Sequence, residues 1–132
     1  ILIEDYASIG GSPDRHPMEL WRPRLPPDVV ATRNIAISSA GPLRVAGLVA
    51  VRQAPSSAGG FVFLSLEDET GLCDVVVDPR LAARARRELS APSLLVEGEL
   101  SIRQGARSVR ARRLIPLRRA LSGAATTRSD RG

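Results

Sequence analysis

The segment Phe61–Pro79, FVFLSLEDETGLCDVVVDP, limits the folds open to this chain more than any other segment. Two runs of strand-forming residues flank the short acidic turn DETG, which is the pattern of a β-hairpin. Because side chains alternate between the two faces of a strand, one face of the first run is aliphatic and carries Val62, Leu64 and Leu66. The other face carries Phe61, Phe63 and Ser65. Only 3% of the chain is aromatic, so the core must be aliphatic, and we expect both rings on the outer face.

Further strand-forming runs lie on both sides of this hairpin. The five runs are Leu43–Gln53, Phe61–Glu67, Leu72–Asp78, Pro92–Gln104 and Arg107–Leu117. One helical pattern, Pro79–Leu89, separates the third run from the fourth, with Leu81, Ala85 and Leu89 on one face. Gly47 and Gly98 sit in the middle of the first and fourth runs, where glycine permits the sharp coiling of a barrel strand. This order predicts an all-β, five-stranded OB-fold, a Greek-key barrel with one helix between its third and fourth strands.

The composition divides the chain into three expected parts. Residues 1–40 are dense in Gly and Pro, which interrupt helices and strands, and form a linker or docking arm. Within that arm Pro17–Arg22 is long enough for one helical turn, and we expect Trp21 to anchor the arm to the barrel. Residues 41–117 form the OB-fold domain, and the polar residues 118–132 form a disordered tail.

Charge and cysteine content limit which partners and which cellular compartment we expect for this chain. The net charge is +5 and all 19 basic residues are arginine, which favours an anionic partner or simple solubility. The single cysteine, Cys73, excludes an internal disulfide and a cysteine-based zinc cluster. No run resembles a membrane span or a secretory signal, so we expect an intracellular protein without membrane contact. The chain begins with Ile1 rather than methionine, and we expect it to be a fragment of a longer protein.

No residue pattern indicates catalysis, a cofactor or a metal. The acidic run Glu67–Glu69, with Asp74 and Asp78 nearby, resembles a metal site only superficially, because acidic residues in a tight hairpin usually form the turn. His16 is the only histidine, and its place in the arm gives no reason to pair it with Cys73 as a catalytic dyad. We therefore expect no catalytic residue, no cofactor and no metal ligand.

Arginines on the strands are candidate phosphate contacts, because phosphate binding needs cations but no base edges. Arg44 and Arg52 have the parity opposite to Val45, Val49 and Val51 in the first strand. The other candidates lie around the last turn and on the last strand: Arg103, Arg107, Arg110 and Arg112. For any one of them a solvated charge is the alternative. The helix arginines Arg84, Arg86 and Arg87 are interpreted as solubilising.

The segment VAGLVAVRQAPSSAGGFVFLSLEDETGLCDVVVDP resembles the OB domain near the C-terminus of bacterial C-family DNA polymerase III α subunits, closest to the error-prone branch. That family has a strand G-V-V-x-x-R-Q, a Gly-rich loop, and then F-x-x-L-E-D-x-T-G before a Val-rich strand. The resemblance extends from about Asp5 to Leu117, with RHPMELWRPRL upstream and VRARRL in the closing strand. Asp78 and Pro79 depart from it, because an apolar or aromatic residue is expected after the third strand.

The resemblance implies a module that binds single-stranded DNA within an error-prone polymerase, for translesion and replicative synthesis in the bacterial cytoplasm at the nucleoid. The catalytic palm domain is absent, so this chain alone is expected not to polymerise DNA and to be monomeric. A related strand in the anticodon-binding OB domains of class II aminoacyl-tRNA synthetases stacks bases on its Phe, which favours Phe63 first and Phe61 second. Ser65, on the same face, is included among the expected nucleic-acid contacts.

Three alternatives remain open at this stage. One ring could plug the barrel end or pack under the N-terminal arm. The exposed face could instead dock another polymerase or mutasome subunit. The domain could also bind tRNA, as the synthetase domains do.

Overall fold

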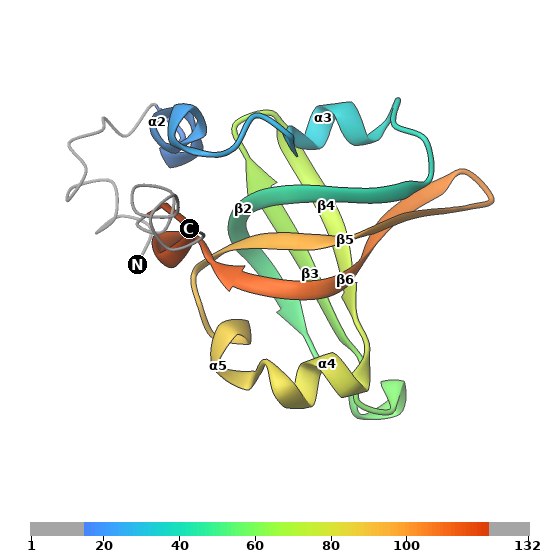
Figure 1. The fold of residues 1–132 in the computed structure, drawn as a ribbon. Helices are drawn as coiled ribbons and strands as arrows, with labels where there is room; N and C mark the ends of the chain where they lie inside the picture. The colour runs from blue at the N-terminus through green and yellow to red at the C-terminus, as the bar shows by residue number, and fades with distance from the viewer. Residues whose placement is uncertain (1–14, 122–132) are drawn as a thin grey trace, which may run out of the picture.

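The computed structural model describes residues 15–121, which contain a closed barrel of five strands (Figure 1). The barrel strands are β2 Gly41–Gln53, β3 Val62–Asp68, β4 Gly71–Val77, β5 Ser93–Arg103 and β6 Ala106–Pro116. They follow the order β2-β3-β4-β6-β5, and pairing of β2 with β5 closes the ring. The β4–β6 pairing is parallel and the other four barrel pairings are antiparallel. This topology confirms the predicted Greek-key barrel.

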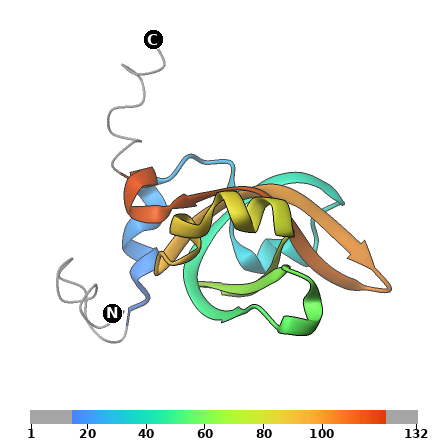
Figure 2. The same ribbon diagram turned by 90° about the horizontal axis from the view of Figure 1, so that it is seen from below.

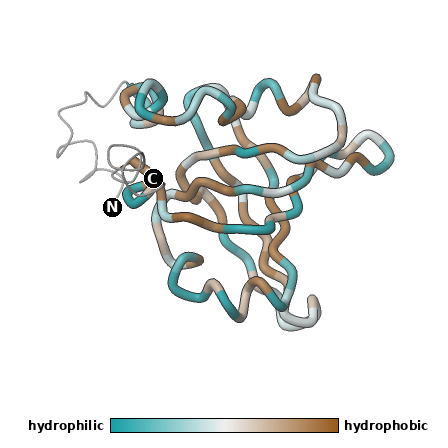
Figure 3. The backbone as a smooth tube through the Cα atoms, viewed as in Figure 1, coloured by the Kyte–Doolittle hydropathy of each residue, from teal (hydrophilic) through white to brown (hydrophobic). Residues whose placement is uncertain are grey.

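The β3–β4 hairpin has the faces that its alternation predicts. Its register runs from Val62 opposite Val77 to Asp68 opposite Gly71. Leu64 and Leu66 are 2% and 0% exposed within the barrel core, whereas Phe63 is 37% exposed on the outer face. The aliphatic side of the hairpin therefore forms the core, as expected. Hydrophobic residues recur along the strands in Figure 3.

Two glycines lie where barrel strands approach closely. A Cβ atom at Gly47 would lie 2.7 Å from the carbonyl oxygen of Glu67, and one at Gly98 would lie 2.2 Å from the carbonyl oxygen of Arg110. Side-chain carbon atoms do not tolerate such distances from backbone. These positions thus require glycine for strand packing, which agrees with the sharply coiled strands predicted from the sequence.

A pair of short helices covers the lower end of the barrel in Figure 1 and crosses it in Figure 2. The sequence predicts one helix over Pro79–Leu89, but the structure has α4 Pro79–Arg84 and α5 Arg86–Leu89. The helix breaks at Ala85, whose φ of −108° and ψ of 35° are not helical. Leu81 and Ala85 still pack into the core as the pattern predicts. Asp78 caps α4, since its carboxylate accepts a hydrogen bond from the Leu81 amide at 2.9 Å.

The described part of the N-terminal arm, residues 15–40, packs against the barrel. It contains α2 Pro17–Trp21, a 3₁₀ turn Arg22–Arg24, the strand β1 Val29–Val30 and α3 Thr32–Ile35. The sequence reasoning missed β1, which pairs in parallel with β2. Trp21 is 8% exposed in a second apolar cluster, which confirms its anchoring role. That cluster lies on the outer side of the barrel and includes Met18, Leu25, Val29, Ala46, Leu48, Leu95 and Leu117.

The C-terminal boundary lies later than predicted. Residues 117–121 are helical, and Leu117 and Leu121 are 0% and 7% exposed in the second cluster. The expected disordered tail of residues 118–132 is therefore wrong for residues 118–121, because their apolar side chains pack on the barrel. The remaining residues of that tail, 122–132, and residues 1–14 of the arm lie outside the described part of the chain.

A β-bulge in β2 overturns the predicted parity of its second half. The register with β3 shifts between Val49 and Val51, so Val51 lies opposite the outward-facing Ser65. Val51 is consequently 45% exposed instead of buried. The same shift places Arg52 opposite the core residue Leu64. Arg44 and Arg52 therefore do not share a face of the strand, contrary to the expectation from simple alternation.

Candidate nucleic-acid interface

The two phenylalanines form one aromatic surface on the outside of β3. Their ring centroids lie 6.3 Å apart and their planes differ by 16°, so the rings are nearly parallel. Phe63 is 37% exposed and Phe61 is partly exposed. Flat rings facing water in this way offer faces on which nucleobases can stack. The structure thus brings together the two aromatic residues that the sequence predicts as stacking residues.

A row of residues crosses the outer face of the barrel at Phe63. Phe63 lies opposite Val76 of β4, and Val76 lies opposite Arg110 of β6. Neighbouring strands lie about 4.8 Å apart, so the backbone of Arg110 is about 10 Å from that of Phe63. An arginine that is 65% exposed in its side chain therefore lies two strands from the aromatic surface. The parallel β4–β6 pairing creates this proximity.

The outer face changes along β3 from aromatic to acidic side chains. Beyond Phe63, Ser65 donates a hydrogen bond to the Asp74 carboxylate at 3.4 Å, and Glu67 follows on the same face. These carboxylates repel phosphate groups. Ser65 therefore lies on the acidic part of the face, whereas the aromatic rings lie toward the basic part. The predicted site residue Ser65 is adjacent to the rings but already has a carboxylate partner.

Two arginines of β6 form the basic part of this face. Arg110 lies 3.7 Å from the Asp78 carboxylate, and Arg112 lies 3.2 Å from that of Glu99. A register shift in the β5–β6 pairing leaves Arg112 between Ala111, opposite Gly98, and Arg113, opposite Glu97. Both arginine side chains are more than 60% exposed, so these ion pairs are open to solvent and to competing anions.

Arg44 lies elsewhere on the barrel. Its strand position is opposite Glu97 of β5 and Val29 of β1, not opposite β3. Its guanidinium pairs with the carboxylates of Asp28 and Glu97, and the hydrogen bond that it donates to Asp28 raises its pKa. The structure therefore does not bring Arg44 to the aromatic surface, and two carboxylates already neutralise its charge.

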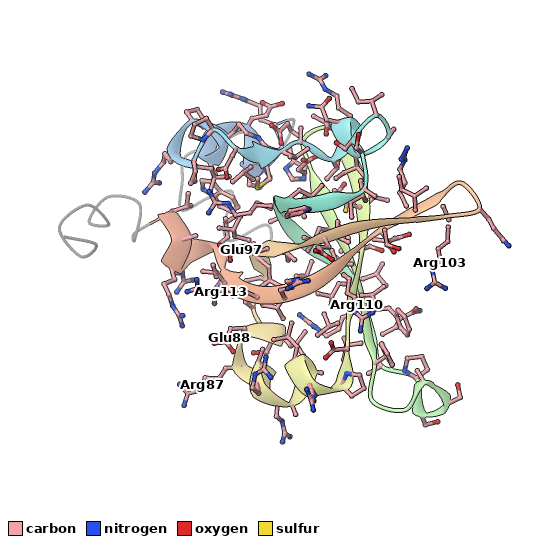
Figure 4. The ribbon with its side chains drawn as sticks, turned by 45° about the vertical axis from the view of Figure 1, so that its right-hand side comes forward. Arg87, Glu88, Glu97, Arg103, Arg110 and Arg113 are labelled. Atoms are coloured by element: carbon pink, nitrogen blue, oxygen red, sulfur yellow. The ribbon has the colours of Figure 1, made fainter. Side chains whose placement is uncertain are left out.

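The remaining predicted arginines lie around the ends of the barrel. Arg52 donates a hydrogen bond to the carbonyl oxygen of Ala91 at 3.3 Å. Arg103 extends from the β5–β6 hairpin (Figure 4) and is exposed. Arg107 is partly buried on the same strand parity as the core residue Val109, and its Nη1 atom has no hydrogen-bond partner among the described residues. None of the three lies in the row that contains Phe63 and Arg110.

The acidic turn has a structural role that the sequence reasoning missed. The side chain of Asp68 is fully buried and accepts hydrogen bonds from the backbone or hydroxyl groups of Thr32, Thr70 and Gly71. Arg22 of the arm donates to Asp68 at 2.9 Å and to both oxygens of Glu69. Burial alone would raise the pKa of Asp68, but the hydrogen bonds from Thr32 and Thr70 hold that pKa below its usual value. The turn therefore ties the arm to the β3–β4 hairpin.

The two residues considered for nucleophilic chemistry also have structural roles. Cys73 is 5% exposed in the core, and burial raises the pKa of its thiol to about 12. His16 caps α2, since its Nδ1 accepts a hydrogen bond from the Met18 amide at 3.1 Å. Among residues 15–121, no three acidic, histidine or cysteine side chains gather as metal ligands would. The same residues contain no helix long and apolar enough to cross a membrane.

A cavity of about 520 Å³ between α4 and β6 contains arginines that the sequence reasoning did not select. Its walls are Asp78, Arg80, Leu81, Arg84, Glu99, Arg110, Ala111 and Arg112. Arg84 was interpreted as solubilising, and Arg80 was not considered. Their spacing of four residues, which places them on one face of a helix, was a signal in the sequence. The sequence did not show that α4 faces β6.

Comparison with known proteins agrees with this geometry. The chain is 45% identical over 107 residues to an error-prone DNA polymerase of Alkalilimnicola ehrlichii, which covers 80% of this chain and 10% of the polymerase. It is 39% identical over 132 residues to an error-prone DNA polymerase of Ralstonia nicotianae, which covers 98% of this chain and 12% of the polymerase. The chain thus spans about a tenth of the length of these relatives.

The fold is shared with a solved structure and with a described family. Asparaginyl-tRNA synthetase from Pyrococcus horikoshii superimposes with a TM-score of 0.53 at 21% identity, over 67% of this chain and 22% of the synthetase. Residues 43–117 match the family described as the OB-fold nucleic acid binding domain. This match covers more than half of the chain, and it coincides with the barrel that carries the aromatic surface. The chain belongs to the family of OB-fold nucleic acid binding domains.

Proposed function

We propose that this chain is a single-stranded DNA binding module of an error-prone DNA polymerase. The observation that carries the proposal is the aromatic pair Phe61 and Phe63 on the outside of the barrel, with Phe63 in the same cross-strand row as Arg110. The relatives named as error-prone DNA polymerases support the choice of DNA. In the full-length bacterial protein the module would hold template during translesion and replicative synthesis in the cytoplasm.

The binding mode follows from the chemistry of the face. Successive bases stack on the two rings, and each stacked base contributes about 1–3 kcal/mol. The phosphates lie toward Arg110 and Arg112 and away from the carboxylates of Asp74 and Glu67. Base stacking on rings and arginine contacts to phosphate do not read base edges, so binding is expected to have little sequence preference.

A salt series with the 132-residue chain and a fluorescent oligonucleotide of roughly 4–16 nucleotides tests this proposal. If about three phosphates are contacted, the log–log salt slope is about −2, at roughly −0.7 for each contact on a single strand. Phe63→Ala should weaken binding by about 1–3 kcal/mol and leave that slope unchanged, because a ring releases no counterions.

Leu72→Ala is the matched control for Phe63→Ala. Leu72 is 64% exposed at the acidic end of the same hairpin, opposite Glu67, so its removal also deletes an exposed apolar side chain. We expect wild-type affinity for that variant. Equal weakening by both substitutions, or none by Phe63→Ala, would contradict base stacking at Phe63. A large loss of thermal stability in Phe63→Ala would show that the ring is a packing residue.

A second function, docking of another polymerase or mutasome subunit, is favoured by a different observation. Val51 and Leu72 are exposed apolar residues on β2 and β4, the strands on either side of Phe63. A partner protein bound there would bury apolar surface and release few counterions. If the chain binds a partner subunit with an affinity that is independent of salt, and binds no oligonucleotide, docking would be favoured over DNA binding.

The type of nucleic acid and the absence of catalysis can be tested separately. Preference for RNA over DNA of the same sequence would favour a tRNA-binding role like that of the synthetase domains. We further propose that this chain has no nucleotidyl-transfer activity of its own, because it spans only about a tenth of the polymerases it resembles. Nucleotide incorporation on a primed template by the purified chain would contradict that proposal.

A further inference from the structure

The cavity between α4 and β6 is lined by four arginines and two carboxylates, so its charged groups sum to a positive charge. Its volume of about 520 Å³ is within the range of ligand sites, roughly 300–1,000 Å³. Small organic ligands usually occupy apolar clefts, whereas only Leu81 and Ala111 contribute apolar side chains to this one. The lining therefore suits an anion.

The carboxylates of the cavity already have partners on β6. Asp78 pairs with Arg110 at 3.7 Å and Glu99 pairs with Arg112 at 3.2 Å. Asp78 is further occupied by the Leu81 amide that it caps. The carboxylate contacts at ion-pair distance thus go to β6, and not to Arg80 or Arg84 of α4.

Arg80 and Arg84 supply the positive charge of α4 in this cavity. Among residues 15–121, neither guanidinium forms an ion pair or a side-chain hydrogen bond, and both residues are exposed. They lie four residues apart on α4 and line the same cavity, so both can reach one ligand. Arginine suits phosphate because its planar group donates two parallel hydrogen bonds.

The cavity also adjoins the aromatic surface. The β3–β4 register ends at Val62 opposite Val77, so the next step along the two chains sets Phe61 beside Asp78. A close approach supports this placement, because a Cβ atom at Gly60 would lie 3.1 Å from the Cβ atom of Pro79. A strand stacked on the rings would thus pass the mouth of the cavity.

We propose that this cavity is a phosphate-binding site in which Arg80 and Arg84 hold a phosphodiester group of the strand that stacks on Phe61 and Phe63. The site deepens the proposed DNA-binding function and rests on it for the source of the phosphate. A free phosphate ion has the same chemistry, and the experiment separates the two sources.

The test compares two double variants that remove the same charge. Arg80→Gln with Arg84→Gln changes the cavity, and Arg86→Gln with Arg87→Gln changes α5. Arg86 and Arg87 are exposed and do not line the cavity, and Figure 4 shows Arg87 on α5, away from Arg110. Glutamine keeps the helix propensity close to that of arginine.

With a fluorescent single strand, the cavity variant should flatten the salt slope by about 0.7, the value for one phosphate contact on a single strand. At about 0.1 M salt this corresponds to roughly fivefold weaker binding. The α5 variant should keep the wild-type slope. If wild-type protein binds the strand and both double variants bind alike, the cavity proposal is overturned while the proposed function survives.

Changing the ligand tests the site without changing the protein. One phosphate of the strand is replaced by a neutral methylphosphonate at each position in turn. One position should cost the wild-type protein about fivefold in affinity at about 0.1 M salt, and should cost the cavity variant nothing further. If every position costs both proteins equally, no phosphate lies in this cavity.

If wild-type protein binds no single strand, the proposed function fails, and inorganic phosphate then decides the cavity. NMR shifts of the arginine side chains of the chain are followed during phosphate titration. Saturable shifts that vanish in the cavity variant but persist in the α5 variant would assign the site to free phosphate. Absence of such shifts in that case would overturn the site for both sources.

Discussion

Replacing Asp68 with asparagine removes the charge that ties the N-terminal arm to the β3–β4 hairpin. Oδ1 accepts hydrogen bonds from Thr32, Thr70 and Gly71, and Oδ2 accepts from the Thr32 amide and Arg22, all between 2.7 and 3.1 Å. An asparagine of the same shape must turn its amide group toward one of these two sets of donors. Donors then face donors in a buried site, and Arg22 loses one of its two carboxylate partners.

We expect this substitution to lower the free energy of unfolding by about 3–5 kcal/mol, the range for removing one member of a buried charge pair. Urea unfolding followed by circular dichroism measures the change. Asp74→Asn is the matched control, because Asp74 is exposed on the same hairpin and, within residues 15–121, its carboxylate accepts only the 3.4 Å bond from Ser65. Its effect should stay within about 0.5 kcal/mol. If the two variants lose similar stability, the hydrogen bonds to Asp68 do not stabilise the fold as argued.

The pKa of Asp68 predicts how the stability difference between wild type and Asp68→Asn depends on pH. The pKa of Asp68 in the folded chain lies below its ordinary value of 3.8, because the threonine hydrogen bonds outweigh the effect of burial. A depressed folded pKa means that the stabilisation is fully present well above the unfolded pKa and is lost as pH falls through the folded pKa. The stability gap between wild type and Asp68→Asn should therefore be constant above about pH 5 and should narrow below about pH 4. A gap that widens in acid would contradict this sign.

Two further predictions concern the core. Gly98→Ala should destabilise the barrel more than Gly47→Ala, because its Cβ atom would lie 2.2 Å from backbone oxygen instead of 2.7 Å; equal or reversed midpoints in urea would refute the packing argument. Cys73, with a thiol pKa of about 12, should react with a thiol reagent at about pH 8 far more slowly in the native chain than in urea. Rapid labelling of the native chain would show that the thiol is accessible.

Local sequence predicted the parts of the fold that depend on neighbouring residues. Alternation within β3 is strict, so it correctly assigned Leu64 and Leu66 to the core and Phe63 to the outer face. The order of strand-forming runs and one helical pattern was enough for the barrel topology. Trp21 in a Pro-rich arm was correctly expected to pack on the barrel, since a large apolar ring rarely remains in water without a partner.

The sequence-based prediction was wrong where the register between two paired strands shifts. The bulge in β2 shows only in the register against β3, and it exposes Val51 and redirects Arg52. A single extra residue reverses the face of every residue after it. No alternation pattern within β2 contains that information, because the shift depends on the partner strand.

The sequence by itself determined which residues can stack and which can bind phosphate, because that is the chemistry of rings and guanidinium groups. Only the tertiary structure decided which of them lie close together. Closure of the barrel through the parallel β4–β6 pairing places Arg110 in the row of Phe63 and beside Arg80 of α4, whereas pairing with Asp28 and Glu97 removes Arg44 from the site. Residues distant in sequence become neighbours only when the ring of strands closes. The sequence therefore could not show which arginines lie near the rings and which are paired with carboxylates.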